Sequence, residues 1–155
     1  MSIFTEQEAR AILDKVIKLS KADECTATLS GAESGNIRFA LNNVTTSGSV
    51  SNASLGVQVA FGKRVGTASI NEFDDASLER VVRRAEDLAR LAPENPEFVP
   101  AIDKQAYKPS ATYSESTAAV TPEFRAQIAA DSIQPCRGHG LVAAGFLEDG
   151  HGFVA

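Results

Sequence analysis

Apolar positions follow a helical period at the start of the chain. Between residues 5 and 20 they recur three or four positions apart, which places them on one side of a helix. Thr5 and Glu8 have the spacing of a capping box, in which each side chain accepts a hydrogen bond from the other residue's backbone N–H. A second apolar stripe, from about Asp75 to Leu91, predicts another helix, capped by Asp74 or Asp75.

Between these two helices the apolar period changes from 3.6 residues to 2. Alternation of this kind is typical of strands that bury one face. Turn-forming pairs separate the alternating segments, at Ser34-Gly35, Asn42-Asn43 and Gly62-Lys63. Short connections favour antiparallel neighbours. We therefore predict an α+β fold of two layers, in which an antiparallel meander of about five strands between residues 23 and 71 packs against the two helices.

The pattern changes again after residue 92. Residues 93–114 contain several prolines, which favour an extended connector. Thr121-Pro122-Glu123 predicts a helix start, with the helix ending near Ser132. A strand over 141–147, a turn at Glu148-Asp149-Gly150 and a further strand from Phe153 follow. The prolines of the predicted connector, residues 93–114, are Pro93, Pro96, Pro100 and Pro109.

One helix with one and a half strands cannot close a core. We expect residues 1–92 to be an amino-terminal domain, 93–114 a linker, and 115–155 the start of a truncated central domain. Because strand 141–147 would then lack partners, this tail should be less stable than residues 5–92.

Composition narrows the class of protein. Apolar residues make up 43% of the chain and charged residues 23%, a globular balance, and the formal net charge is −5. An acidic chain of this kind is a poor non-specific ligand for nucleic acid.

The amino terminus lacks the apolar core of a secretory signal, and no apolar run is long enough to span a membrane. Cys25 and Cys136 have no disulfide-framework spacing. We therefore expect a cytoplasmic protein that binds neither membrane nor nucleic acid.

A zinc site is one candidate for chemistry. Cys136, His139 and His151 are suitable ligands, but they number three at most and are flanked by glycines, as loop histidines often are. No H-E-x-x-H helix occurs, and no G-x-S-x-G sequence supports a serine nucleophile. Cys25 lies on an inward strand position, where a thiol is usually inert.

Charged clusters are explained by structure rather than catalysis. Asp74-Asp75 and Glu148-Asp149 lie where carboxylates cap helices or stabilise turns. Arg80, Arg83 and Arg84 form a small basic patch, and the pairs Glu79–Arg83 and Glu86–Arg90 indicate a solvated helix face. The sequence therefore predicts no catalytic residue and no metal ligand within these 155 residues.

A polar segment between Val44 and Asn52 has two interpretations. It could be an edge strand that is polar because this prevents aggregation. It could also be an edge that accepts an extended peptide as an added strand, in which case the contacting residues would be Thr45, Thr46, Ser47, Gly48 and Ser49.

Several segments, taken in order, resemble the amino-terminal domain of the TldD/PmbA metallopeptidases, also described as candidate modulators of DNA gyrase. The similarity covers residues 5–100 and continues less distinctly to Phe146. The segments are Ala22-Asp-Glu-Cys25, Asn36-Ile-Arg-Phe-Ala40, Asn43-Val-Thr-Thr-Ser-Gly-Ser49, Phe61-Gly-Lys-Arg-Val-Gly-Thr-Ala68, Asp74-Asp-Ala-Ser-Leu78 and Ala92-Pro-Glu-Asn-Pro-Glu97.

The resemblance implies that the chain is a fragment of a cytosolic protein about three times as long. In that family one paralogue holds zinc through an H-E-x-x-x-H helix and a distant cysteine and cleaves peptides, while a partner paralogue lacks these ligands, and the two can form a dimer. The fragment would then be inactive alone, with no cofactor of its own. It would help to form the peptide cavity and the dimer of a zinc metallopeptidase. The alternative is a non-enzymatic module of the ligand-free, PmbA-type partner.

Overall fold

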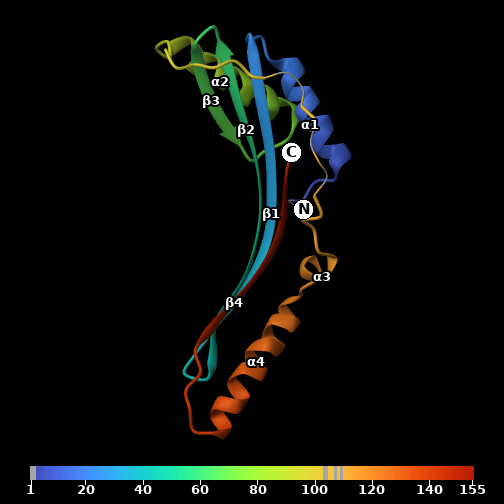
Figure 1. The fold of residues 1–155 in the computed structure, drawn as a ribbon, viewed down its shortest axis with the longest axis vertical. Helices are drawn as coiled ribbons and strands as arrows, with labels where there is room; N and C mark the ends of the chain where they lie inside the picture. Colours follow the sequence, from blue (N-terminus) through green and yellow to red (C-terminus); the bar gives the residue numbers. More distant parts are fainter. Residues whose placement is uncertain (1–2, 103–104, 107, 109) are drawn as a thin grey trace.

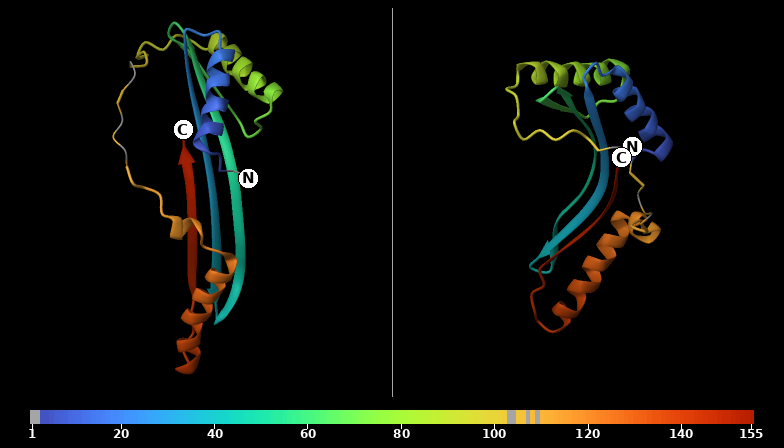
Figure 2. Two further views of the ribbon diagram at one scale, coloured as in Figure 1. Left: turned by 90° about the vertical axis from the view of Figure 1, so that its right-hand side faces the viewer. Right: turned by 45° about the horizontal axis from the view of Figure 1, so that its top comes forward.

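The computed structural model describes residues 3–102, 105–106, 108 and 110–155 as a head of helices and strands with a long arm (Figure 1). Helices α1 and α2 lie in the head, and α4 runs along the arm (Figure 2). In chain order the elements are α1 (Glu6–Leu19), β1 (Glu24–Ala40), β2 (Asn43–Phe61), β3 (Arg64–Ile70), α2 (Asp75–Leu91), α3 (Glu115–Ala118), α4 (Pro122–Gly138) and β4 (Gly145–Val154).

The described strands form one antiparallel sheet in the order β3-β2-β1-β4. In the head, β2 pairs with β3 over Leu55–Phe61. The arm consists of the remaining lengths of β1 and β2, together with β4, which pairs with Ser30–Phe39 of β1. The α+β fold class is confirmed, but two long strands and the short β3 replace the five predicted between residues 23 and 71, and the fourth described strand comes from the tail.

The hydrophobic core lies between one face of the sheet and helices α1 and α2. Leu29 of β1 and Leu55 of β2 are directly paired and fully buried. They contact a cluster that includes Val16 of α1 and Val82 of α2. Because side chains on one face of a strand recur at every second residue, Ile37 of β1 lies on the same face further along the arm. There it is buried, as are Ala129 and Ile133 of α4.

Local sequence signals explain the two helices of the head. The predicted capping box is present: Glu8 Oε2 accepts from Thr5 N–H at 2.8 Å, and Thr5 Oγ1 accepts from Glu8 N–H at 3.3 Å. The hydrogen bond from the backbone of Thr5 lowers the pKa of Glu8. Asp74 caps α2 by accepting from Ser77 N–H at 3.1 Å, and hydrogen bonds from Ser77 lower its pKa. Both predicted helix starts are confirmed.

Turn prediction was less accurate. The chain reverses at Gly62-Lys63 as predicted, with φ +57° at the glycine. The β1–β2 turn lies one residue earlier than predicted, at Leu41 and Asn42, which have φ 51° and 60°. The Asn42 side chain explains this shift, because it accepts from Ala143 N–H and donates to the Leu141 carbonyl, which holds it in the turn.

The predicted reversal at Ser34-Gly35 is wrong. Both residues lie inside β1, where Ser34 pairs with Val50 on one side and Gly150 on the other. Their backbone groups are engaged by two neighbouring strands, so the segment is extended although its composition is typical of a turn. The segments 44–52 and 55–61 are likewise one continuous strand, β2.

The tail also differs from its prediction. Helix α4 continues to Gly138 rather than ending near Ser132, and β4 begins at Gly145 instead of residue 141. The turn predicted at Glu148-Asp149-Gly150 is wrong, because these residues lie within β4 and pair with β1. A strand partner that lies over 100 residues earlier in the chain is not visible in local pattern. The expectation that this segment lacks partners is therefore wrong.

Residues 93–114 contain no helix or strand in their described part. The segment crosses from the head to α3 as a long connection (Figure 2). It is anchored by Asn95 N–H, which donates to the Lys63 carbonyl at 2.9 Å, and by Ala101 N–H, which donates to Glu24 Oε2 at 3.0 Å. Pro109 lies outside the described residues.

The three domain boundaries stay predictions. None of the described helices is long and apolar enough to cross a membrane.

A buried carboxylate joins the two helices of the head. Glu86 of α2 is 1% exposed and accepts from Lys21 N–H and from Arg83 Nη1, each at 2.6 Å. Arg83 also donates to the Leu19 carbonyl at the end of α1, at 2.7 Å. Burial raises the pKa of Glu86, but the hydrogen bonds from Lys21 and Arg83 and the charges of Arg83 and Arg90 outweigh it, so the net pKa is lowered. Glu86 and its partners therefore hold the α1–β1 connection against α2.

Replacing Glu86 by glutamine should destabilise the protein at neutral pH. A carboxylate whose pKa is lowered by folding stabilises the folded state above its unfolded pKa, and this contribution is lost as the pH falls through the folded pKa. We expect Glu86→Gln to lower the free energy of unfolding by about 2 kcal/mol at pH 7. The difference from wild type should shrink as the pH is lowered below about 4.

Urea unfolding at a series of pH values measures the free energy of unfolding of the variant and of the wild type, and so tests this prediction. The control is Glu79→Gln on the same helix, where the carboxylate is exposed and lies 3.9 Å from Arg83. It should change stability by less than about 0.5 kcal/mol. A Glu86→Gln effect that is small at pH 7, or that grows in acid, would contradict the assigned role of Glu86.

Candidate functional site

Two rows of polar residues cross the arm on the face that α4 covers. Directly paired residues on neighbouring strands project from the same face of a sheet. In the first row Ser51 of β2, Glu33 of β1 and His151 of β4 are paired. In the second row Ser49, Gly35 and Asp149 are paired in the same way. The pairing of three strands thus brings together residues that lie far apart in the sequence.

Arg125 of α4 lies over the second row. Its side chain is 3% exposed, Nη1 donates to Asp149 Oδ1 at 2.7 Å, and Nη2 donates to Ser49 Oγ at 3.3 Å. A Cβ atom on Gly35 would overlap the guanidinium group, so this glycine is needed for the close approach rather than for a turn. Arg125 therefore links α4 to all three strands of the arm.

A cavity of about 320 Å³ lies beside Arg125. Its polar lining comes from both rows, and its apolar lining includes Val120 and Pro122 at the start of α4. Glu33 Oε2 lies 3.9 Å from His151 Nε2, and Ser51 Oγ donates to Glu33 Oε1 at 3.3 Å. The Tyr113 ring packs edge-on against His151, with ring centroids 6.5 Å apart. The cavity therefore lies between the sheet, the end of α3 and the first turn of α4.

Sequence reasoning missed Arg125, although a signal was present. Arg125, Ala129 and Ile133 are spaced four residues apart, so the arginine belongs to the stripe of α4 that is buried against the sheet. A charged residue in a buried stripe indicates a specific partner, because an unpaired buried charge is costly. Asp149, assigned to a turn by its sequence, is that partner.

The polar segment named in the sequence lies on β2 in the arm. Ser49 enters the cavity, and the other four residues extend from it toward the tip of the arm. Thr45 Oγ1 donates to the Arg38 carbonyl at 3.2 Å, and Ser47 Oγ donates to the Asn36 carbonyl at 3.3 Å, so both hydroxyls are directed at β1. Because β3 pairs only with Leu55–Phe61, no described strand occupies the outer edge of Asn43–Ser54.

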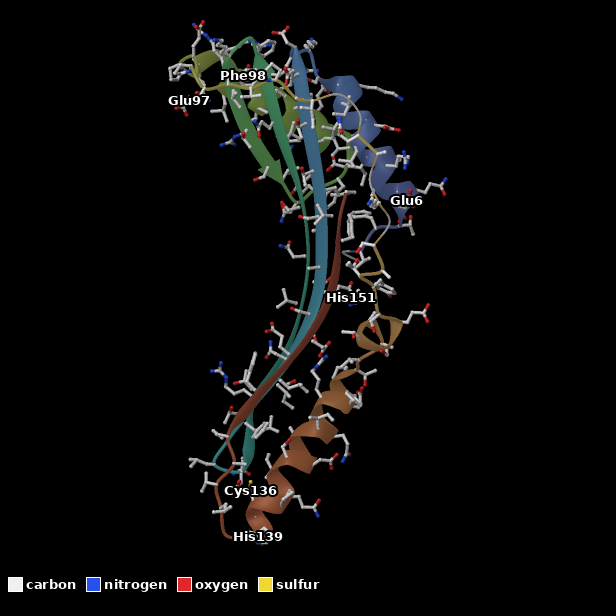
Figure 3. All side chains as sticks on the ribbon, in the orientation of Figure 1. Glu6, Glu97, Phe98, Cys136, His139 and His151 are labelled. Carbon is white, nitrogen blue, oxygen red and sulfur yellow. The ribbon has the colours of Figure 1, made fainter. Side chains whose placement is uncertain are left out.

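The structure separates the three residues of the zinc candidate. Cys136 and His139 lie at the tip of the arm, where α4 ends, whereas His151 lies near its middle on β4 (Figure 3). Within the described part of the chain, no group of three or more histidine, cysteine, aspartate or glutamate residues could hold a metal ion. Cys25 is half-buried, and burial raises the pKa of its thiol. A raised pKa disfavours the reactive thiolate.

Known proteins share part of this sequence and most of this fold. Residues 27–89 match the first domain of the PmbA/TldA metallopeptidases. A search of curated protein sequences gives no significant match. Three solved structures share the fold over nearly the whole chain. TldE from Thermococcus kodakarensis has a TM-score of 0.75 and 15% identity, covering 95% of this chain and 34% of its own.

The other two structures are candidate modulators of DNA gyrase. The protein from Bacteroides thetaiotaomicron has a TM-score of 0.72 and 16% identity, covering 97% of this chain and 36% of its own. The protein from Thermotoga maritima has a TM-score of 0.68 and 13% identity, covering 94% of this chain and 33% of its own. The chain thus spans about a third of the length of the solved structures that it matches.

The fold and the sequence match together define the class of this protein. It is an α+β domain of the kind found in PmbA/TldA metallopeptidases. Residues 27–89 are similar to an amino-terminal domain of the TldD/PmbA family, as the sequence segments indicated, and the fold of nearly the whole chain is shared with the three solved structures.

Proposed function

We propose that this chain is the amino-terminal, non-catalytic part of a TldD/PmbA-like zinc metallopeptidase, and that it binds extended peptide through β2. The observation that carries this proposal is the outer edge of Asn43–Ser54, which lies beside a polar cavity and has no strand partner among the described residues. An exposed edge presents a row of backbone N–H and C=O groups that an extended peptide can pair with.

The side chains of this edge support the proposal. Thr45 and Ser47 turn their hydroxyls toward β1, and Gly48 has no side chain, so the outer backbone groups are not covered by bulky residues. Backbone pairing would bind peptides with little regard to sequence, which suits a protein that processes many peptides. Long polar edges are usually shielded in natural sheets, whereas β1 is the one described strand that pairs with this segment.

The catalytic zinc and the second subunit belong to the whole protein in this proposal. The chain supplies one wall of the peptide cavity, and the metal is held by residues outside these 155. A homodimer or a heterodimer with a family member would complete the assembly. The same edge would serve a ligand-free subunit of the PmbA type, so the proposal for β2 holds for either paralogue.

Alternate N-methylation of a peptide tests the strand-addition mode. In an added strand only every second backbone amide faces its neighbour, so methyl groups on one alternate set block pairing and those on the other set do not. We expect an extended eight-residue peptide to lose at least about 10-fold in affinity when one set is methylated and to change by less than about 2-fold when the other is.

Fluorescence anisotropy with the carboxyl-terminally labelled peptides measures these affinities. The two methylated peptides have the same composition, so each is the control for the other. Equal affinities for both methylated forms would contradict strand addition, and so would the absence of any peptide binding.

A further inference from the structure

We propose that Val50 is a specificity-determining residue of the β2 edge, and that it makes this edge prefer a peptide with one aromatic side chain. This inference rests on the proposed function, and it adds a chemical preference that backbone pairing alone does not provide. Among residues 45–52 of β2, Val50 has the one large apolar side chain. That side chain is 60% exposed, so its apolar surface is open to a peptide on this edge.

The Val50 side chain projects from the face of the arm opposite α4. Its neighbour Ser49 lies on the face that α4 covers, because Arg125 of α4 donates to the Ser49 hydroxyl group. Val50 borders the same cavity as an edge residue between Ser49 and Ser51. Successive side chains of a strand point to opposite faces, however, so the valine points away from the helix.

The neighbours of Val50 on this face are small. Val50 is directly paired with Ser34 of β1, and Ser34 is paired in turn with Gly150 of β4. Two residues before Val50 on the same strand is Gly48, which has no side chain. An aromatic ring that covers Val50 would therefore have room to lie across the sheet without displacing a bulky side chain.

The geometry of an added strand brings one peptide residue next to Val50. Every second side chain of that strand lies on the face from which Val50 projects. The peptide residue directly opposite Val50 would have its Cβ atom about 5 Å from the Cβ atom of the valine. Pairs of an aromatic and a β-branched residue in this position are among those that stabilise a sheet. An aromatic residue at this one position would therefore raise affinity and fix the register of the peptide.

The alternate peptide side chains meet different partners. Those directly opposite Ser49 and Ser51 project from the face that α4 covers. Their cross-strand neighbours are hydroxyl groups, which offer no comparable apolar surface. The gain from an aromatic residue should therefore appear at every second position of the peptide.

Five peptides of eight residues test the inference. The first is a host peptide of threonine, serine and glutamine, and the other four carry one phenylalanine at successive central positions of this host. We expect the two phenylalanine peptides of one alternate set to bind about 2- to 5-fold more tightly than the host. The two of the other set should stay within about 1.5-fold of it. Fluorescence anisotropy measures all five affinities.

Val50→Thr should abolish this gain and leave the affinity for the host peptide unchanged. Threonine keeps the β-branched shape and the strand preference of valine, and it replaces one methyl group by a hydroxyl group. The control Val154→Thr makes the same change at an exposed valine on the same face of the sheet, but on β4, two strands away from β2. This control should keep the gain.

Equal affinity of all five peptides for the wild-type protein would overturn the inference while leaving the proposed function intact. A gain that survives Val50→Thr would also overturn it, and so would a Val50→Thr protein that weakens the host peptide as much as the phenylalanine peptides. If no peptide binds, the proposed function and this inference both fail.

Discussion

Gly66→Ala should prevent β3 from docking on α2. A Cβ atom on Gly66 would overlap the backbone of Ala85 and Ala89, so the strand and the helix are in contact through main-chain atoms. Neither backbone can move away without opening the core, in which Ala85 and Ala89 are fully buried. We expect the free energy of unfolding to fall by at least about 3 kcal/mol, a large part of the stability of an ordinary domain.

Gly56→Ala is the matched control, because it adds the same methyl group to the neighbouring strand. The nearest atom to that Cβ would be the Thr28 carbonyl oxygen at 3.9 Å, an ordinary contact. Urea unfolding should show a change within about 0.5 kcal/mol for this variant. If Gly66→Ala were equally mild, the close packing of β3 on α2 would be wrong.

Asp149→Ala should have the second large effect, because it leaves Arg125 buried without its carboxylate. Removing one partner of a buried ion pair costs about 3 kcal/mol or more, since the remaining charge is neither solvated nor paired. The double variant Arg125→Met/Asp149→Ala should recover at least half of that loss, because no charge is then buried. Thermal or urea unfolding measures both variants.

The control for Asp149→Ala is Asp131→Ala on the exposed side of α4, where the carboxylate accepts from Gln127 at 2.8 Å. It should change stability by less than about 0.5 kcal/mol. A double variant that is no more stable than Asp149→Ala would contradict the assignment of the loss to an unpaired Arg125. It would point instead to a contribution of Asp149 that is independent of the arginine.

The helices of the head were predictable because their signals are local. The capping box at Thr5 and Glu8 and the cap at Asp74 each depend on residues within three positions. The ends of the strands were harder, because glycine has more than one use. Gly35 resembles a turn residue in the sequence, yet it lies in a strand and accommodates the Arg125 guanidinium group. Composition cannot distinguish these two reasons for a glycine.

The candidate site was only partly predictable. The polar segment that contains Thr45 and Ser49 is visible in the sequence, whereas its neighbours in the cavity come from β4 and α4. Asp149 meets Arg125 only because β4 pairs with β1, and pairing between distant segments leaves no local pattern. Arg125 could have been identified from its place on the buried stripe of α4, which explains why it needs a partner but not which residue supplies it.

Hydrogen exchange of the β2 backbone tests the central proposal most directly. In the free protein, the amides of Thr45–Ser49 that face away from β1 should exchange readily, because no described strand accepts from them. Saturation with the unmethylated eight-residue peptide should slow exchange at alternate residues of this segment and leave the amides of β4 unchanged. Slowed exchange elsewhere, with none between Thr45 and Ser49, would show that the peptide binds at another surface and would contradict the proposed function of this edge.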